Sequence, residues 1–143
     1  MNDKEVKTAI ETRYKVKLTR AEDLYNLIWK YGKYTSSYND LKYSRNTAVS
    51  RFLNGLPINC GNYSEDIVAP VLRALGYLVN IWLCRVKCAN GWYGGHWLVK
   101  CTGRRWENKI FDGVSAVYHK PFGTPVCSVV KYDRAEGNSI RTD

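Results

Sequence analysis

Apolar residues in the first half of the chain recur every three or four positions, the spacing of a helix that buries one face. After a capping-box pattern at Thr19–Glu22, for example, Leu24, Leu27 and Ile28 follow at this spacing. The stretch 34–43 is instead rich in turn formers and tyrosine, which predicts a surface connection. The pattern predicts four helices, over Asp3–Tyr14, Thr19–Gly32, Ser44–Leu53 and Cys60–Leu75.

The end of the fourth predicted helix marks a change from helical to extended patterning. Pro70 should remove one backbone hydrogen bond and bend this helix, and Gly76 should end it. From Tyr77 onward, β-branched and aromatic runs alternate with glycine-containing turns, which is typical of antiparallel strands. The residues after Ala135 are expected to fray. The predicted strands are Tyr77–Lys87, His96–Cys101, Trp106–Phe111 and Val126–Tyr132, so the fold class is α+β.

Size and charge narrow the class of protein further. The chain has 143 residues, 45% of them hydrophobic, which suits one domain with its own core. A net charge of +9 favours an anionic partner, but no zinc-finger, helix-turn-helix or RNA-binding pattern supports nucleic acid. No signal peptide and no run of about 20 apolar residues is visible, so we expect a protein made in the cytoplasm without a membrane partner.

The cysteines are Cys60, Cys84, Cys88, Cys101 and Cys127. Their number is odd, and in a reducing cytoplasm we expect all of them to be free thiols. An alternative is a zinc site built from Cys84, Cys88, His96 and Cys101. On an extended strand, however, Cys84 and Cys88 would lie about 13 Å apart, which disfavours zinc.

Cys60, His96 and Asp112 form the candidate catalytic set. A helix N-terminus favours the thiolate form of a cysteine such as Cys60. His96 can then move a proton near neutral pH, and Asp112 can orient its ring. Antiparallel strands joined by a short turn would bring His96 and Asp112 to the same end of a sheet. The alternatives are a buried structural thiol, a hydrogen-bonded strand histidine and an aspartate that only caps its turn.

Four further residues are candidates for the oxyanion and substrate-binding positions. Asn59 precedes the candidate nucleophile and Tyr63 follows it by one helical turn, on a groove wall or in the core. Trp92 and Tyr93 stand directly before Gly94, Gly95 and His96, where they either line a cleft or pack on the sheet as ordinary hairpin aromatics.

The motifs Asn59-Cys60-Gly-Asn-Tyr-Ser, Gly94-Gly-His96-Trp-Leu-Val and Ile110-Phe-Asp112-Gly resemble the core of the transglutaminase-like cysteine enzymes. Within that superfamily they are most similar to the pseudomurein endoisopeptidases of methanogens and their viruses. The resemblance covers 45–117. It implies a papain/transglutaminase-like core with N-terminal helices and a nucleophile-bearing helix packed on an antiparallel sheet. We expect one catalytic domain, 1–143, with a helical part (1–44) and the core (45–135).

The resemblance also implies an activity, namely hydrolysis of the Ala-(ε)Lys isopeptide crosslink of pseudomurein by a Cys-His-Asp triad. The expected enzyme is a monomer that is made in the host cytoplasm, acts on the cell wall and needs no cofactor for the chemistry, although Ca²⁺ assists related enzymes. Pseudomurein-binding repeats are not recognised in this sequence. The alternatives are another transglutaminase-like amide hydrolase or acyltransferase, and a basic zinc-stabilised or nucleic-acid-binding module.

Overall fold

The computed structural model describes residues 1–36, 41–103 and 106–141, with side chains described outside 104–108. Its helices are α1 (Asp3–Tyr14), α2 (Ala21–Tyr31), α3 (Arg45–Leu53), α4 (Cys60–Asn62), the π-helical segment η1 (Tyr63–Val68), α5 (Ala69–Ala74) and α6 (Gly113–Val117). The strands are β1 (Leu78–Lys87), β2 (Tyr93–Gly103), β3 (Trp106–Phe111) and β4 (Ser128–Ala135). No helix of the described part is long and apolar enough to span a membrane.

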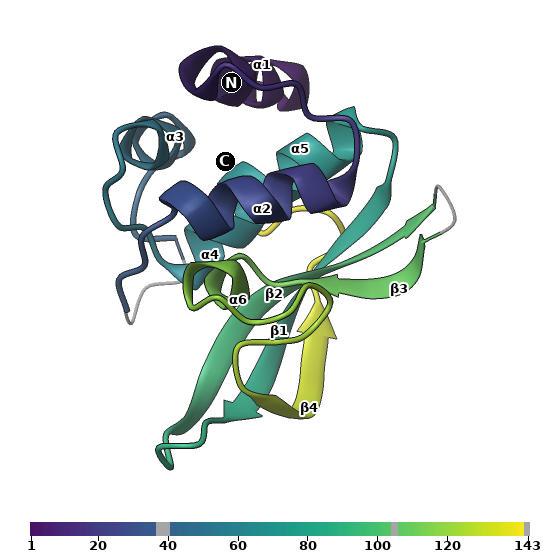
Figure 1. Cartoon of the computed structure of the whole chain (residues 1–143). Coiled ribbons are helices and arrows are strands. Elements are labelled where there is room, and N and C mark those ends of the chain that lie inside the picture. The colour runs from purple at the N-terminus through teal and green to yellow at the C-terminus, as the bar shows by residue number, and fades with distance from the viewer. Residues whose placement is uncertain (37–40, 104–105, 142–143) are drawn as a thin grey trace.

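The four strands form one antiparallel sheet in the order β3-β2-β1-β4, and the N-terminal helices lie together on one side of it (Figure 1). The α+β class and the antiparallel sheet predicted from the sequence are therefore confirmed. A continuous core joins the helices to the sheet, with Ile10, Leu24 and Phe52 from the helices packed in the same cluster as Ile81 and Val99 from the strands. This shared core fixes the helices relative to the sheet.

The predicted helix from Cys60 exists, and it changes its helical register just before Pro70. Before Pro70 the helix widens into η1, where the Ala69 amide donates to Ser64, five residues back. In that register the Glu65 carbonyl would be the partner of residue 70, and proline has no amide hydrogen to give it. The Arg45 guanidinium supplies the missing donor at 3.0 Å from the Glu65 carbonyl oxygen.

The prediction that the chain frays after Ala135 is wrong for residues 136–141, whereas residues 142–143 lie outside the described residues. Ser139 and Ile140 donate hydrogen bonds to the Glu65 carboxylate, at 2.5 and 2.7 Å. The Arg141 guanidinium pairs with Asp66 at 2.7 Å. Glu65 and Asp66 are both buried in η1, so they draw polar partners from a distant part of the chain.

Other element bounds also differ from prediction: β2 starts at Tyr93, three residues before the predicted strand at His96–Cys101, and ends at Gly103, two residues after it. β4 begins at Ser128, two residues later than the predicted strand, and pairs with β1. The short helix α6 was not predicted, because five residues are too few to show helical periodicity.

The expectation that all cysteines are free is wrong, because Cys88 and Cys127 form a disulfide. Cys60, Cys84 and Cys101 are free thiols. The alternative zinc set also fails: Cys88 is bonded to Cys127, while Cys84 and Cys101 belong to different hydrophobic clusters of the sheet.

Candidate active site

Cys60 is the first residue of α4 and is half-buried. Asn59 is the N-cap of this helix, since its side-chain oxygen accepts from the Asn62 amide at 2.8 Å and its carbonyl accepts from the Tyr63 amide at 2.9 Å. These bonds fix the first turn of the helix around the thiol. The predicted helix-start position of Cys60 is therefore present, and Asn59 shapes it.

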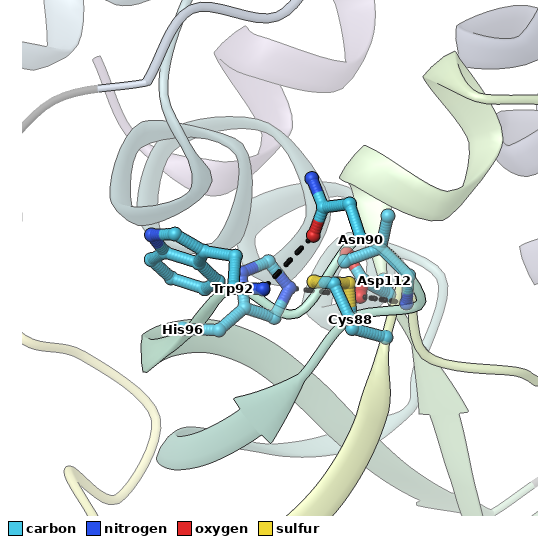
Figure 2. Close-up of a disulfide and its surroundings, with 7 residues drawn as sticks. Cys88, Asn90, Trp92, His96 and Asp112 are labelled. Atoms are coloured by element: carbon cyan, nitrogen blue, oxygen red, sulfur yellow. Dashed lines mark hydrogen bonds and ion pairs between the residues drawn. A yellow bond between two sulfur atoms is a disulfide. The ribbon is translucent and has the colours of Figure 1, made fainter.

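Asp112 lies between β3 and α6 and is 1% exposed. Its Oδ1 caps α6 by accepting from the amides of Val114 and Ser115, at 3.0 and 3.4 Å. Its Oδ2 lies 2.8 Å from Nε2 of His96 and accepts from the Val126 amide at 2.9 Å (Figure 2). The capping role and the histidine-orienting role were alternatives in the sequence, whereas the structure combines them in one carboxylate.

His96 bonds Asp112 through Nε2, and the Cys60 side chain lies near enough to contribute to the pKa of the ring. Because Nε2 is bonded to Asp112, Nδ1 is the ring nitrogen left for the sulfur. Burial alone would lower the pKa of His96, but the charge and hydrogen bond of Asp112 and those of Cys60 outweigh burial and raise it from 6.5 to about 10. The ring is therefore protonated at neutral pH, beside the sulfur.

This raised pKa predicts how stability depends on pH. Protonated His96 stabilises the fold fully below its unfolded pKa of 6.5, and the stabilisation is lost as pH rises through about 10. The difference in unfolding free energy between the wild type and His96→Gln should therefore shrink over this range. Urea unfolding of both proteins between about pH 6 and about pH 10 measures it. A difference that stays constant with pH would contradict the prediction.

Of the predicted substrate-binding residues, Tyr63 is buried, whereas Trp92 and Tyr93 are exposed. Tyr63 lies in the core, 1% exposed, and its hydroxyl donates to the Lys33 carbonyl at 2.6 Å, so it faces no groove. Trp92 and Tyr93 are 51% and 57% exposed at the β1–β2 turn. The Trp92 ring lies against Gly94, where a Cβ would come within 2.6 Å of it. An exposed indole thus lies two residues from Gly94 and four from His96.

Sequence reasoning missed Tyr34, which it assigned to a surface connection. Tyr34 forms a parallel bridge with Ile58, two residues before Cys60, and its ring packs edge-on against Tyr118 at 6.0 Å between centroids. Burial raises the pKa of Tyr34 to about 12, with smaller contributions from the charges of Cys60, Tyr118 and Asp112. Its hydroxyl forms no hydrogen bond with any residue that the structure describes. No periodic signal in the sequence marks this position.

The described residues do not fit a calcium or zinc site. Within that part of the chain, no three side chains of His, Cys, Asp or Glu gather as ligands. The buried carboxylates Glu65 and Asp66 are already occupied by arginine and amide donors.

Cysteine peptidases use a thiol nucleophile, a histidine that accepts and donates its proton, and a carboxylate that orients the histidine. The residue types of this site fit that class. The comparison of sequences leads to the same class. The chain belongs to the pseudomurein endo-isopeptidase family, peptidase family C71, because the family model for the pseudomurein endo-isopeptidase Pei matches residues 2–135.

Two relatives come from viruses of methanogens. The pseudomurein endoisopeptidase of Methanobacterium phage psiM2 is 33% identical over 120 residues, covering 76% of this chain and 37% of the relative. Pseudomurein endoisopeptidase PeiW of Methanothermobacter phage psiM100 is 36% identical over 110 residues, covering 76% of this chain and 38% of the relative. The chain thus spans less than two fifths of the length of these relatives.

Proposed function

We propose that this protein is a cysteine endoisopeptidase that hydrolyses the Ala-(ε)Lys crosslink of archaeal pseudomurein and so lyses the cell wall. The observation that carries the chemistry is the 2.8 Å bond between His96 and Asp112, with the Cys60 side chain near enough to help raise the pKa of His96. The choice of pseudomurein as the substrate rests on the family membership and on the names of both relatives.

In the proposed reaction the Cys60 thiolate attacks the carbonyl carbon of the crosslink and forms a tetrahedral intermediate. The protonated His96 then donates its proton to the lysine ε-nitrogen, the carbon–nitrogen bond breaks, and the free amine leaves. The acyl group remains on Cys60 as a thioester. The raised pKa of His96 supports this step, because the ring enters the reaction already carrying the proton.

Hydrolysis of the thioester completes the cycle. His96, neutral after the first step, takes a proton from water, and the resulting hydroxide attacks the thioester carbonyl. The tetrahedral intermediate collapses, the carbon–sulfur bond breaks, and the thiolate of Cys60 is restored beside the protonated ring. The product leaves as a carboxylic acid and loses its proton to solvent. Asp112 holds the ring in one orientation through both steps, and its own position is held by the amides at α6. All of these groups belong to the protein, so we propose that the chemistry needs no cofactor.

The negative oxygen of the tetrahedral intermediate needs hydrogen-bond donors. We propose the Cys60 backbone amide at the helix start as one donor. We propose the Tyr34 hydroxyl as the second, because the charge of Cys60 contributes to raising its pKa. The bridge between Tyr34 and Ile58 supports this choice, because it ties the tyrosine to the strand-like segment that leads into Cys60.

Tyr34→Phe should therefore lower kcat by about 10²-fold with little change in KM, the effect of losing one oxyanion donor. Steady-state kinetics on a soluble crosslink peptide measures both constants. Tyr25→Phe is the matched control, because the Tyr25 hydroxyl is committed to the Lys120 carbonyl at 2.5 Å. Equal kcat values for Tyr34→Phe and the wild type would remove Tyr34 from the mechanism.

We further propose that 1–143 is one catalytic domain with a papain/transglutaminase-like core, made in the host cytoplasm, active on the wall and monomeric. The helix-borne cysteine, the antiparallel sheet and the main hydrophobic cluster, which joins helices and strands, support this organisation. The net charge of +9 supports attraction to an acidic wall polymer.

The activity is tested on isolated walls. Pseudomurein sacculi should lose turbidity and gain free lysine ε-amines, measured by dinitrophenyl labelling, whereas bacterial murein sacculi should be unchanged. Equal action on both polymers, or loss of turbidity without new ε-amines, would contradict the proposed bond. Incorporation of added glycine ethyl ester at the cleaved alanine would instead indicate the acyltransferase alternative.

A further inference from the structure

The Asp112 carboxylate depends on a donor from outside its own helix. Its Oδ2 atom bonds His96 and also accepts the Val126 amide, at 2.8 and 2.9 Å. Two donors on one oxygen fix the direction in which the carboxylate faces the ring. The position of the Val126 amide is therefore part of the geometry of the His96–Asp112 pair.

Val126 lies in a connection without regular structure. The connection runs from the end of α6 to the start of β4, and pairing with β1 begins only at Ser128. The nearest hydrogen bonds along it are local, from the Ser115 hydroxyl to the Thr124 carbonyl and from the Thr124 hydroxyl to the Pro121 carbonyl. These bonds hold the middle of the connection, two residues before Val126.

The covalent anchor lies immediately after Val126. Cys127 is bonded to Cys88, the residue that follows β1 and begins the turn leading to β2 and His96. That turn is itself closed by a hydrogen bond from the Cys88 amide to the Trp92 carbonyl at 2.8 Å. Figure 2 draws the disulfide together with His96 and Asp112. The bond thus joins the segment that donates to Asp112 to the turn that precedes the histidine.

We propose that the Cys88–Cys127 disulfide is a positioning element of the active site, which holds the Val126 amide on Asp112 and so keeps His96 oriented. This inference rests on the proposed function. Its consequence is that full activity needs two opposite redox states in one chain, a reduced Cys60 and an oxidised Cys88–Cys127 pair. Both cysteines of the pair are partly exposed, so a small reductant can reach them.

Reduction by dithiothreitol is a two-electron exchange. One thiolate of the reductant attacks a sulfur of the disulfide, and the second displaces the mixed disulfide. The products are two protein thiols and the cyclic oxidised reductant. The connection then keeps its hydrogen bonds and the packing of Phe122 and Val126 on the core, but it loses its covalent anchor next to Val126. Without that anchor the Val126 amide can move away from Asp112. Misplacement of a catalytic group by about 1 Å costs on the order of 10²-fold in rate.

The test is a titration of the wild-type protein with dithiothreitol, followed by alkylation and mass spectrometry to count free thiols. Activity on soluble crosslink peptide should be maximal when Cys60 is free and Cys88 and Cys127 are still joined, then fall by about 10²-fold as that bond opens. Cys88→Ser/Cys127→Ser should lack the falling phase and start about 10²-fold lower in kcat, with KM unchanged. Cys101→Ala, which removes a core thiol, should keep the falling phase.

A spectroscopic measurement separates positioning from loss of fold. The chain has two histidines, so the Nε2 proton that bonds Asp112 is readily assigned to His96 by nuclear magnetic resonance. Its signal should weaken or shift when the disulfide opens while the rest of the spectrum stays folded. Unchanged kcat and an unchanged His96 signal after reduction would overturn the inference, as would five free thiols in the fully active protein. A wild type inactive at every reductant concentration would instead contradict the proposed function.

Discussion

Cys60→Ala should lose activity on pseudomurein by about 10⁴-fold or more, because no other group in the site can form the acyl intermediate. The loss should appear in kcat, since the side chain acts on the bond being broken rather than on distant parts of the substrate. Release of lysine ε-amines from isolated sacculi, followed over hours, measures the residual rate. His96→Ala should fall to a similar rate, and the double variant should be no slower, because the two residues act as one unit.

The matched control is Cys101→Ala. Cys101 is 1% exposed in the core, and burial, with a contribution from the charge of Glu22, raises the pKa of its thiol to about 12. It therefore stays protonated, and its loss should leave the rate near that of the wild type. Lysis by Cys60→Ala at the parental rate, with the fold intact by circular dichroism, would end the proposal of a Cys60 nucleophile.

Arg45→Ala should lower the free energy of unfolding strongly, because it removes the arginine of a buried ion pair. The Arg45 guanidinium bonds the fully buried Asp66 at 3.0 Å and the Glu65 carbonyl left without an amide donor by Pro70. Removing it leaves a buried carboxylate with one arginine instead of two, together with an unpaired carbonyl. Loss of one partner of a buried ion pair lowers the free energy of unfolding by about 3–5 kcal/mol. We expect about 3 kcal/mol here, because Arg141 still pairs with Asp66.

For a chain of this length that cost corresponds to a fall in Tm of about 6–12 °C, measured by thermal unfolding. Arg85→Ala is the control, because its pair with Asp133 at 3.1 Å is 48% exposed on the arginine side. A surface pair of this kind contributes less than about 1 kcal/mol. Equal shifts in Tm for the two variants would show that burial of Asp66 does not make its ion pairs more important.

Local patterning predicted the main helices and strands because each buries one face against the shared core. The sequence also placed Cys60, His96 and Asp112 in an order that the fold brings together, since a helix start, a strand and the end of the next strand are local properties. It could not show that β4 pairs with β1 rather than with β3, because strand order in a sheet depends on long-range packing. That pairing is what brings Cys127 to Cys88.

The missed features share this dependence on distant contacts. Tyr34 was assigned to a surface connection because nothing in its local sequence reveals the bridge to Ile58. The last residues were expected to fray because their partners, Glu65 and Asp66, lie inside a helix more than 70 positions earlier. The disulfide was missed because free thiols were expected in a reducing cytoplasm, and the sequence does not reveal that Cys88 and Cys127 lie next to each other in the fold.

The contact between Arg141 and Asp66 also sets an order of events during synthesis. The two residues are 75 positions apart, and Asp66 stands six residues after the nucleophile in the same continuous helix. While the ribosome is still adding the last strand, that helix carries two carboxylates whose partners from 139–141 have not yet emerged. A nascent chain therefore cannot complete these ion pairs and hydrogen bonds, which lie in the same helix as Cys60, until translation has passed Arg141.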